Sequence, residues 1–168
     1  MISVVISVFV IASIAMLTIM TAQNFVATSN YVQMNDQSRY ALDRISREIR
    51  NASSVVNYSS SNPQFLVLTN DLTGTSSTIT CDTSAGTLIL SRSGQSDQTL
   101  LTGCDTFGFQ FLNRVPLVSG NNLTFYTATN PSTDCKVIDL NWKCSRTILG
   151  SKLNTEVVQT AQVMLRNK

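Results

Sequence analysis

The chain contains no histidine among its 168 residues. This absence excludes Ser-His-Asp and Cys-His nucleophile arrangements and every metal site that needs an imidazole ligand. The sequence also lacks GxGxxG and P-loop patterns, and it has no CxxC pair to supply half of a tetrahedral zinc shell. No two carboxylates stand out as a general acid–base pair. We therefore expect no catalytic residue, no cofactor and no metal site, and predict that the protein is not an enzyme.

Charge is scarce as well. The net charge is only +2, and the one basic cluster, formed by Arg39, Arg44, Arg47 and Arg50, has acids interleaved in it. Nucleic-acid surfaces need clustered lysine and arginine. The charge pattern therefore predicts no nucleic-acid partner, although charge alone leaves a role in DNA uptake open.

The first acidic or basic side chain is Asp36, and residues 1–22 contain only serine and threonine as polar groups. About 20 mainly apolar residues suffice for a helix to cross a bilayer. A cleavable signal peptide has a charged n-region and an apolar stretch of about 7–15 residues, and this segment has neither feature. We predict a retained membrane helix over 1–22, with a signal peptide or a buried core helix as the alternatives.

Helix breakers are missing over the same region, since neither glycine nor proline precedes Pro63. One helix is therefore expected to run to about Ala52. Its amphipathic continuation, 23–53, carries pairs of opposite charge four residues apart on one face, Arg39–Asp43, Asp43–Arg47 and Arg44–Glu48. The other face carries a stripe at helical spacing, formed by Tyr31, Met34, Ser38, Leu42, Ile45, Ile49 and Ala52. The alternative is an anchor, a break and a separate short helix.

Beyond residue 53 the apolar period falls to two, which predicts short strands separated by turns. Such a series is mostly antiparallel, and its apolar face needs a cover that the amphipathic helix can supply. The expected fold is α+β, with a long N-terminal helix packed on an antiparallel sheet formed by 54–168. Strands are predicted at 65–69, 77–93 (a hairpin), 98–104, 105–113, 123–129, 136–144 and 156–167. The Ser/Thr/Asn-rich stretches 53–62, 73–84 and 127–134 predict loops, the second of which overlaps the first arm of the hairpin.

Four cysteines, Cys81, Cys104, Cys135 and Cys144, all lie in the polar part of the chain. An even number of cysteines suits disulfides in an oxidising, extracytoplasmic compartment. A straight strand would separate Cys135 from Cys144 by about 30 Å, far beyond the ~7 Å Cα limit for a disulfide. In a flat meander, Cys81 and Cys104 would lie two strands apart, at roughly 9–10 Å. The pairing among the three possible connectivities therefore stays open.

Several stretches resemble the type IV pilins and type II secretion pseudopilins, in particular the PilW-like minor pilins. "MISVVISVFVIASIAM" is similar to the pilin membrane helix, and "SRYALDRISREIRNAS" to the amphipathic half of that helix in minor pilins. "TAQVMLRNK" resembles the closing strand of the family, and "LTGCDTFGFQFLN" resembles its mid-domain aromatic strand. The likeness extends over the whole chain, but only the helix run is fairly specific.

The resemblance implies a filament subunit that rests in the inner membrane, with its C-terminal domain in the periplasm or at the cell surface. Its expected partners are other pilin or pseudopilin subunits, the inner membrane and the assembly platform of a pilus or secretion system. Leu42, Ile45 and Ile49 are expected to pack on the sheet. The residues expected in the membrane and in the filament core are Ile2, Val5, Phe9, Ile11, Ile14, Leu17 and Ile19.

Family members begin with a short basic leader ending in glycine, followed by an aromatic residue and, five residues into the mature protein, a glutamate. None of these is in this sequence. We expect Met1 to be an internal methionine, about the seventh mature residue. The coding frame upstream of Met1 tests this expectation.

A different class of function is the alternative. A stand-alone membrane-anchored β domain would act as an adhesin or ligand-binding module, and it predicts a flexible break between anchor and domain. The absence of helix breakers before Pro63 favours the filament subunit.

Overall fold

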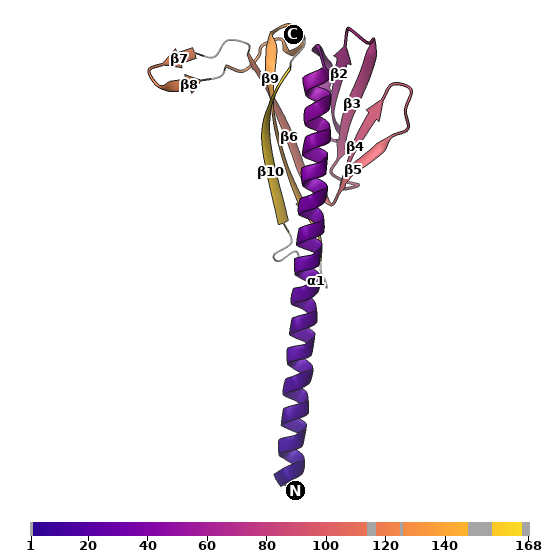
Figure 1. Cartoon of the computed structure of the whole chain (residues 1–168), viewed down its shortest axis with the longest axis vertical. Coiled ribbons are helices and arrows are strands. Elements are labelled where there is room, and N and C mark those ends of the chain that lie inside the picture. The colour runs from indigo at the N-terminus through magenta and orange to yellow at the C-terminus, as the bar shows by residue number, and fades with distance from the viewer. Residues whose placement is uncertain (1, 114–116, 125, 148–155, 166–168) are drawn as a thin grey trace.

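A computed structural model describes residues 2–113, 117–124, 126–147 and 156–165. Its first element is a single helix, α1 (Ile2–Asn51), so the predicted continuity of the helix is confirmed. The C-terminal half of α1 lies against a β domain, while its N-terminal half stands clear of the domain (Figure 1).

The expected α+β class is confirmed, because strands follow the helix and all of their pairings are antiparallel. The strands are β1 (Ser54–Ser59), β2 (Gln64–Asn70), β3 (Thr75–Asp82), β4 (Thr87–Arg92), β5 (Gln98–Thr102), β6 (Cys104–Asn113), β7 (Leu117–Ser119), β8 (Asn122–Thr124), β9 (Cys135–Ser145) and β10 (Glu156–Met164). A one-turn helix, α2 (Pro131–Asp134), precedes β9.

The strands do not form the single sheet that the sequence predicts. They form a five-stranded sheet of order β1-β2-β3-β4-β5, a three-stranded sheet of order β10-β9-β6, and the hairpin β7-β8. The two larger sheets flank the upper half of α1 on opposite sides, and the hairpin projects from the domain (Figure 1). The helix therefore packs in the angle between two sheets rather than on one face.

The change of sheet occurs at Gly103, between β5 and β6. Its φ is +74°, in the left-handed region that favours glycine. A Cβ atom here would lie 2.5 Å from the carbonyl oxygen of Ser145, so a side chain would also clash with the backbone of the second sheet. This turn lets β6 leave the meander and pair with β9, which the period-two pattern alone does not reveal.

The core lies between α1 and the two sheets. Met34, Ala41, Ile45 and Ile49 of the helix are buried there, and Trp142 of β9 is also buried. The indole Nε1 of Trp142 donates a hydrogen bond of 2.9 Å to the Ser38 hydroxyl. A serine in the apolar stripe thus has a partner that its buried oxygen requires.

Three stretches predicted as loops contain regular structure. The stretch 53–62 contains β1, where Val55 is buried and pairs with Leu68 of β2. The stretch 73–84 contains β3, and 127–134 contains α2, which begins with a proline. In 53–62, burial of one β-branched side chain outweighs the loop preference of the surrounding serines and asparagines. Of the strand expected over 123–129, β8 includes Leu123 and Thr124, residue 125 lies outside the described residues, and Thr127 forms an isolated bridge with Leu112.

Candidate functional site

The N-terminal half of α1 is an exposed apolar rod. From Val4 to Met20 its large apolar side chains are between 47% and 70% exposed, and none packs on the domain. Consecutive residues differ by about 100° in direction around a helix, so the apolar surface covers the whole circumference. The alternative of a buried core helix is therefore wrong. By length and composition, this helix is long enough and apolar enough to cross a membrane.

The expected membrane and filament residues all lie on this rod. Val5, Phe9, Ile11, Ile14, Leu17 and Ile19 are all exposed. The side chain of Ile2 lies outside the described residues, although its backbone is helical.

Three hydroxyl groups of the rod bond to the helix itself. Ser13 donates to the Phe9 carbonyl, Thr18 to Ile14 and Thr21 to Leu17, each at 2.8 Å. Such i−4 bonds leave these hydroxyls without a need for water, which suits a helix in an apolar environment. These serines and threonines therefore do not interrupt the apolar surface.

The C-terminal half of α1 buries the predicted stripe in the domain from Met34 onward, whereas Tyr31 at its start is 47% exposed. Ile45 and Ile49 are fully buried, and Leu42 is half-buried against the same core. The packing therefore involves the three residues that the sequence predicts for it, together with Met34 and Ala41. It fixes the helix firmly, because each fully buried side chain of this size contributes about 1.5–3 kcal/mol.

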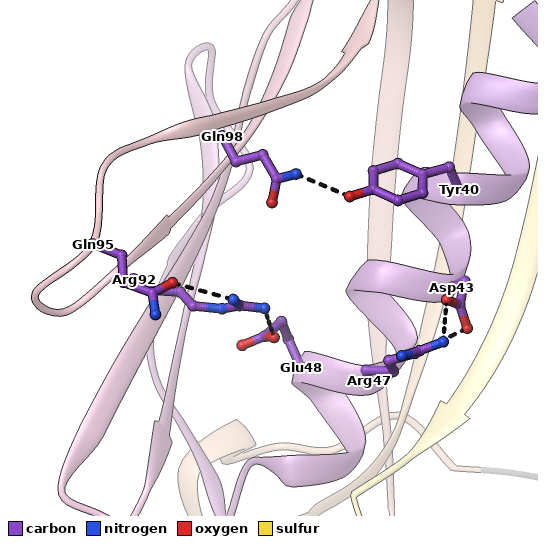
Figure 2. A network of polar contacts seen from close by, with 7 residues as sticks. All are labelled: Tyr40, Asp43, Arg47, Glu48, Arg92, Gln95 and Gln98. Carbon is purple, nitrogen blue, oxygen red and sulfur yellow. Dashed lines mark hydrogen bonds and ion pairs between the residues drawn. The ribbon is translucent and has the colours of Figure 1, made fainter.

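Polar contacts fasten the helix to the edge of the five-stranded sheet (Figure 2). Arg92 of β4 forms an ion pair with Glu48 and donates a hydrogen bond of 3.3 Å to Gln95. Nearer the free half of the helix, Gln98 donates to the Tyr40 hydroxyl at 3.0 Å. The Glu48–Arg92 and Tyr40–Gln98 contacts both join α1 to the five-stranded sheet. They therefore reinforce the apolar packing on the side of that sheet.

The sequence gives the wrong partner for Glu48. It predicts Arg44, four residues earlier, but Glu48 binds Arg92 from β4, and the Nε atom of Arg44 is buried with no hydrogen-bond partner. The predicted pair of Asp43 and Arg47 does form, at 2.7 Å. Helical spacing therefore identifies one exposed pair correctly. Among the described residues, the predicted pair of Arg39 and Asp43 does not form, and the pair that faces the sheet is missed.

Arg146 joins the second sheet to the helix at the N-terminal end of the packed stripe. Its guanidinium donates to the side-chain carbonyl of Gln33 at 2.7 Å and to that of Gln37 at 3.1 Å. Sequence reasoning assigned no role to Arg92 or Arg146. A charged residue just after a strand is the only local signal for Arg146, and it does not identify the helix as the partner.

A polar hollow of about 330 Å³ lies beside the Glu48–Arg92 pair. Its other lining residues are neutral, and most carry hydroxyl or amide groups. Among the described residues, no three His, Cys, Asp or Glu side chains are placed to hold a metal ion. The prediction that the protein is not an enzyme stays a prediction.

Three of the four cysteines meet where the two sheets join. The sulfurs of Cys81 and Cys104 are 3.6 Å apart, and Cys104 lies directly opposite Cys144 in the β6–β9 ladder. The flat meander that underlies the estimate of roughly 9–10 Å does not extend to Cys104, because Cys104 begins the second sheet. Cys135 lies at the other end of β9 from Cys144.

Hydrogen bonding and burial give these three thiols different pKa values. Hydrogen bonding with Cys104 lowers the pKa of Cys81, against the opposing effect of burial. For Cys104, the hydrogen bond with Cys144 lowers the pKa, but that with Cys81 and burial outweigh it and raise the pKa to about 12. Hydrogen bonding with Cys104 and burial also raise the pKa of Cys144. Cys81 is the most acidic of the three.

The molecule thus combines an exposed apolar rod, a β domain fixed to the end of that rod and a buried group of thiols. We compared the chain with known proteins. No protein-family model, no curated protein and no solved structure matches the chain.

Proposed function

We propose that the chain is a minor pilin or pseudopilin, a structural subunit of a type IV pilus or a type II secretion pseudopilus that acts in assembly initiation or in the tip complex. One observation carries the proposal. A single unbroken helix has its second half fixed in a β domain, while its first half presents apolar side chains in every direction.

A helix of this kind can exist in two apolar environments. In a membrane, lipid surrounds the rod, and in a filament, the rods of neighbouring subunits replace the lipid. Lipid tails are as apolar as leucine, so the exchange requires little transfer free energy, and packing decides the outcome. The internal bonds of Ser13, Thr18 and Thr21 keep the rod compatible with both environments.

The same helix argues against a stand-alone adhesin on a membrane anchor. That function predicts a flexible break between anchor and domain, whereas α1 continues without interruption to Asn51. The resemblance of "SRYALDRISREIRNAS" to the minor-pilin helix supports the same choice, and its predicted contacts with the domain involve Leu42, Ile45 and Ile49.

In this proposal the rod crosses the inner membrane once before assembly, and the β domain lies in the periplasm or at the cell surface. The partners are then other pilin or pseudopilin subunits, which contact the rod, and the assembly platform. The four cysteines in the β domain suit an oxidising compartment.

Site-specific photocrosslinking in the cells that make the protein tests this function. A photoreactive phenylalanine analogue replaces Ile14 of the rod, which is 58% exposed. We expect crosslinks from this position to other proteins with an N-terminal apolar helix, and we expect the crosslinked species in sheared filaments or in a purified pseudopilus.

The matched control places the same analogue at Val158 of β10, which is 65% exposed but belongs to the domain. It should not crosslink to helices of other subunits. Crosslinks from Ile14 to lipid alone, with the chain absent from every filament fraction, would contradict the proposal and favour the stand-alone anchor.

A further inference from the structure

The thiols of Cys81, Cys104 and Cys144 form a buried group at the junction of the two sheets. Cys81 comes from β3 of the five-stranded sheet, Cys104 is the first residue of β6, and Cys144 lies in β9. All three are at most 1% exposed. Cys104 is the central member, since it contacts Cys81 and faces Cys144.

The contact between Cys81 and Cys104 bridges the two sheets. Their sulfurs lie 3.6 Å apart, so only a small movement of two side chains separates this contact from a covalent bond of about 2.05 Å. A backbone hydrogen bond also ties the start of β6 to the end of the hairpin that contains β3, because the Cys104 amide donates to the Gly86 carbonyl at 3.0 Å. Gly86 is in the turn that joins β3 to β4.

Cys144 offers Cys104 a second partner within one sheet. The Ser145 amide donates to the Gly103 carbonyl at 2.8 Å, which makes Gly103 and Ser145 a hydrogen-bonded pair. The neighbouring pair, Cys104 and Cys144, is therefore non-hydrogen-bonded, with a usual Cα separation of about 4.5 Å. This value is at the short end of the range of about 4.4–6.8 Å that disulfides adopt, so the pair is possible but tighter.

Cys135 is too distant to take part. It begins β9, whereas Cys144 lies near the end of the same strand, and a strand of that length separates them by about 30 Å. Its thiol donates to the Val137 carbonyl at 3.5 Å. Cys135 is nonetheless as buried as the other three, which makes it a matched control.

We propose that Cys81 and Cys104 form a disulfide that joins the two sheets, and that Cys104 is a shared member that pairs with Cys144 when Cys81 is not available. This inference does not depend on the filament function. It requires only that the domain meets an oxidant of the thiol–disulfide oxidoreductase class.

The chemistry is a two-electron exchange. One cysteine thiolate attacks a sulfur of the oxidoreductase disulfide, and a mixed disulfide forms as the oxidoreductase releases its other sulfur as a thiolate. The second cysteine thiolate then attacks the sulfur of the first cysteine in the mixed disulfide. This attack forms the disulfide within the chain and releases the reduced oxidoreductase. Two protons leave the protein thiols, and two electrons end on the oxidoreductase. Because the thiols are buried in the closed domain, this exchange takes place before the two sheets close over them.

Mass-spectrometric mapping of the full chain tests the pairing. The protein is extracted in detergent without reductant, its thiols are alkylated under denaturing conditions, and the digest is searched for linked peptides. We expect one major link between the Cys81 and Cys104 peptides, with Cys135 and Cys144 alkylated. Reduction should lower the midpoint of thermal unfolding of the domain by about 10 °C or more, since a loop of this length is closed.

Four variants make the test specific. Cys135→Ser and Cys144→Ser should both keep the Cys81–Cys104 link, and Cys81→Ser should move the link to Cys104 and Cys144. In Cys104→Ser no major link should remain. The pairing is overturned if wild-type protein has four alkylated thiols or a major link that includes Cys135 or Cys144. The shared role of Cys104 is overturned if Cys81→Ser forms no link, or if Cys81 and Cys144 become joined in Cys104→Ser.

Discussion

The two halves of α1 share one backbone and differ in what their side chains contact. In the first half, apolar residues face every direction and remain exposed, as at Phe9 and Ile11. In the second half, the buried ones form a single stripe, and Ile45 and Ile49 are fully buried. The difference teaches that the apolar pattern, rather than the number of apolar residues, decides which part of a helix belongs to a domain. A stripe matches one partner surface, whereas an all-round apolar helix matches an apolar environment.

The largest difference between the two halves should appear when an isoleucine in each is replaced by aspartate. Ile45→Asp places an uncompensated carboxylate in the core, and we expect a loss of more than about 4 kcal/mol in the free energy of unfolding, enough to unfold most of the domain. Ile14→Asp should leave domain stability unchanged and reduce membrane association, because a charge at the centre of a membrane helix costs about 2.5–3.5 kcal/mol. Near-UV circular dichroism of the single tryptophan and membrane flotation measure the two outcomes. Equal domain stability in both variants would remove the distinction between the halves.

A pair of serines gives a subtler form of the same comparison. Ser38 accepts the indole hydrogen bond of Trp142 in the core, whereas Ser13 bonds only to its own helix. Ser38→Ala leaves the buried indole N–H without its partner and should cost about 1–3 kcal/mol. Ser13→Ala should change domain stability by less than about 0.5 kcal/mol.

Chemical denaturation, followed by far-ultraviolet circular dichroism, measures the serine variants and those that lack the single tryptophan. The double variant Ser38→Ala/Trp142→Phe should be less destabilised than the sum of its single changes, because it removes both hydrogen-bonding groups. Strict additivity would show that the hydrogen bond contributes nothing.

Charged pairs on the packed half should also differ in strength. Arg92→Met leaves Glu48 without its cation at a site where both side chains are mostly buried, so we expect a loss of about 1–3 kcal/mol. Asp43→Asn breaks an exposed pair with Arg47 and should cost at most about 1 kcal/mol. Thermal unfolding of the two variants side by side measures the difference. A larger loss from Asp43→Asn would show that the helix surface, rather than the sheet contact, carries the electrostatic contribution.

The smallest effect should be a loss of stability at high pH. Lys143 of β9 binds Glu156 of β10 at 2.8 Å, and this hydrogen bond raises the pKa of Lys143 above 10.5. A group with a raised folded-state pKa contributes stability that is fully present below the unfolded value and is lost as the pH rises through the folded value. We therefore expect β10 to loosen only above about pH 10.5, and we expect no such loosening in Lys143→Gln. Hydrogen exchange of β10 amides, compared with that of β3 amides, measures this loosening. Equal pH dependence of the exchange in the wild type and in Lys143→Gln would refute the prediction.

Helical spacing and the absence of breakers were sufficient to predict α1 and most of the residues that it buries, although Ala41 was missed and Tyr31 is exposed. The stripe from Met34 to Ile49 repeats at three and four residues, which a helix alone can satisfy, and the structure buries Ile45 and Ile49 as expected. Period-two alternation likewise located most strands, because it reflects which side of each strand is buried.

The arrangement of the strands was not predictable in the same way. The separation into two sheets depends on the backbone of Gly103 and on its closeness to Ser145, a residue distant in sequence. The contacts of Arg92 with Glu48 and of Arg146 with Gln33 are also long-range, so no local pattern signals them. For the same reason the sequence did not reveal that the sulfurs of Cys81 and Cys104 lie 3.6 Å apart.

The unbroken helix also makes the molecule a mechanical lever. From Val4 to Gln33 it extends for about 45 Å beyond the point where packing begins at Met34, at 1.5 Å per residue. Helices without glycine or proline bend only gently, so a tilt of the domain by about 10° moves the N-terminal end by roughly 8 Å. A force on the domain is therefore transmitted along α1 to its N-terminal end, because no flexible break in the helix absorbs it. The orientation of the domain thus determines the position of the N-terminal end.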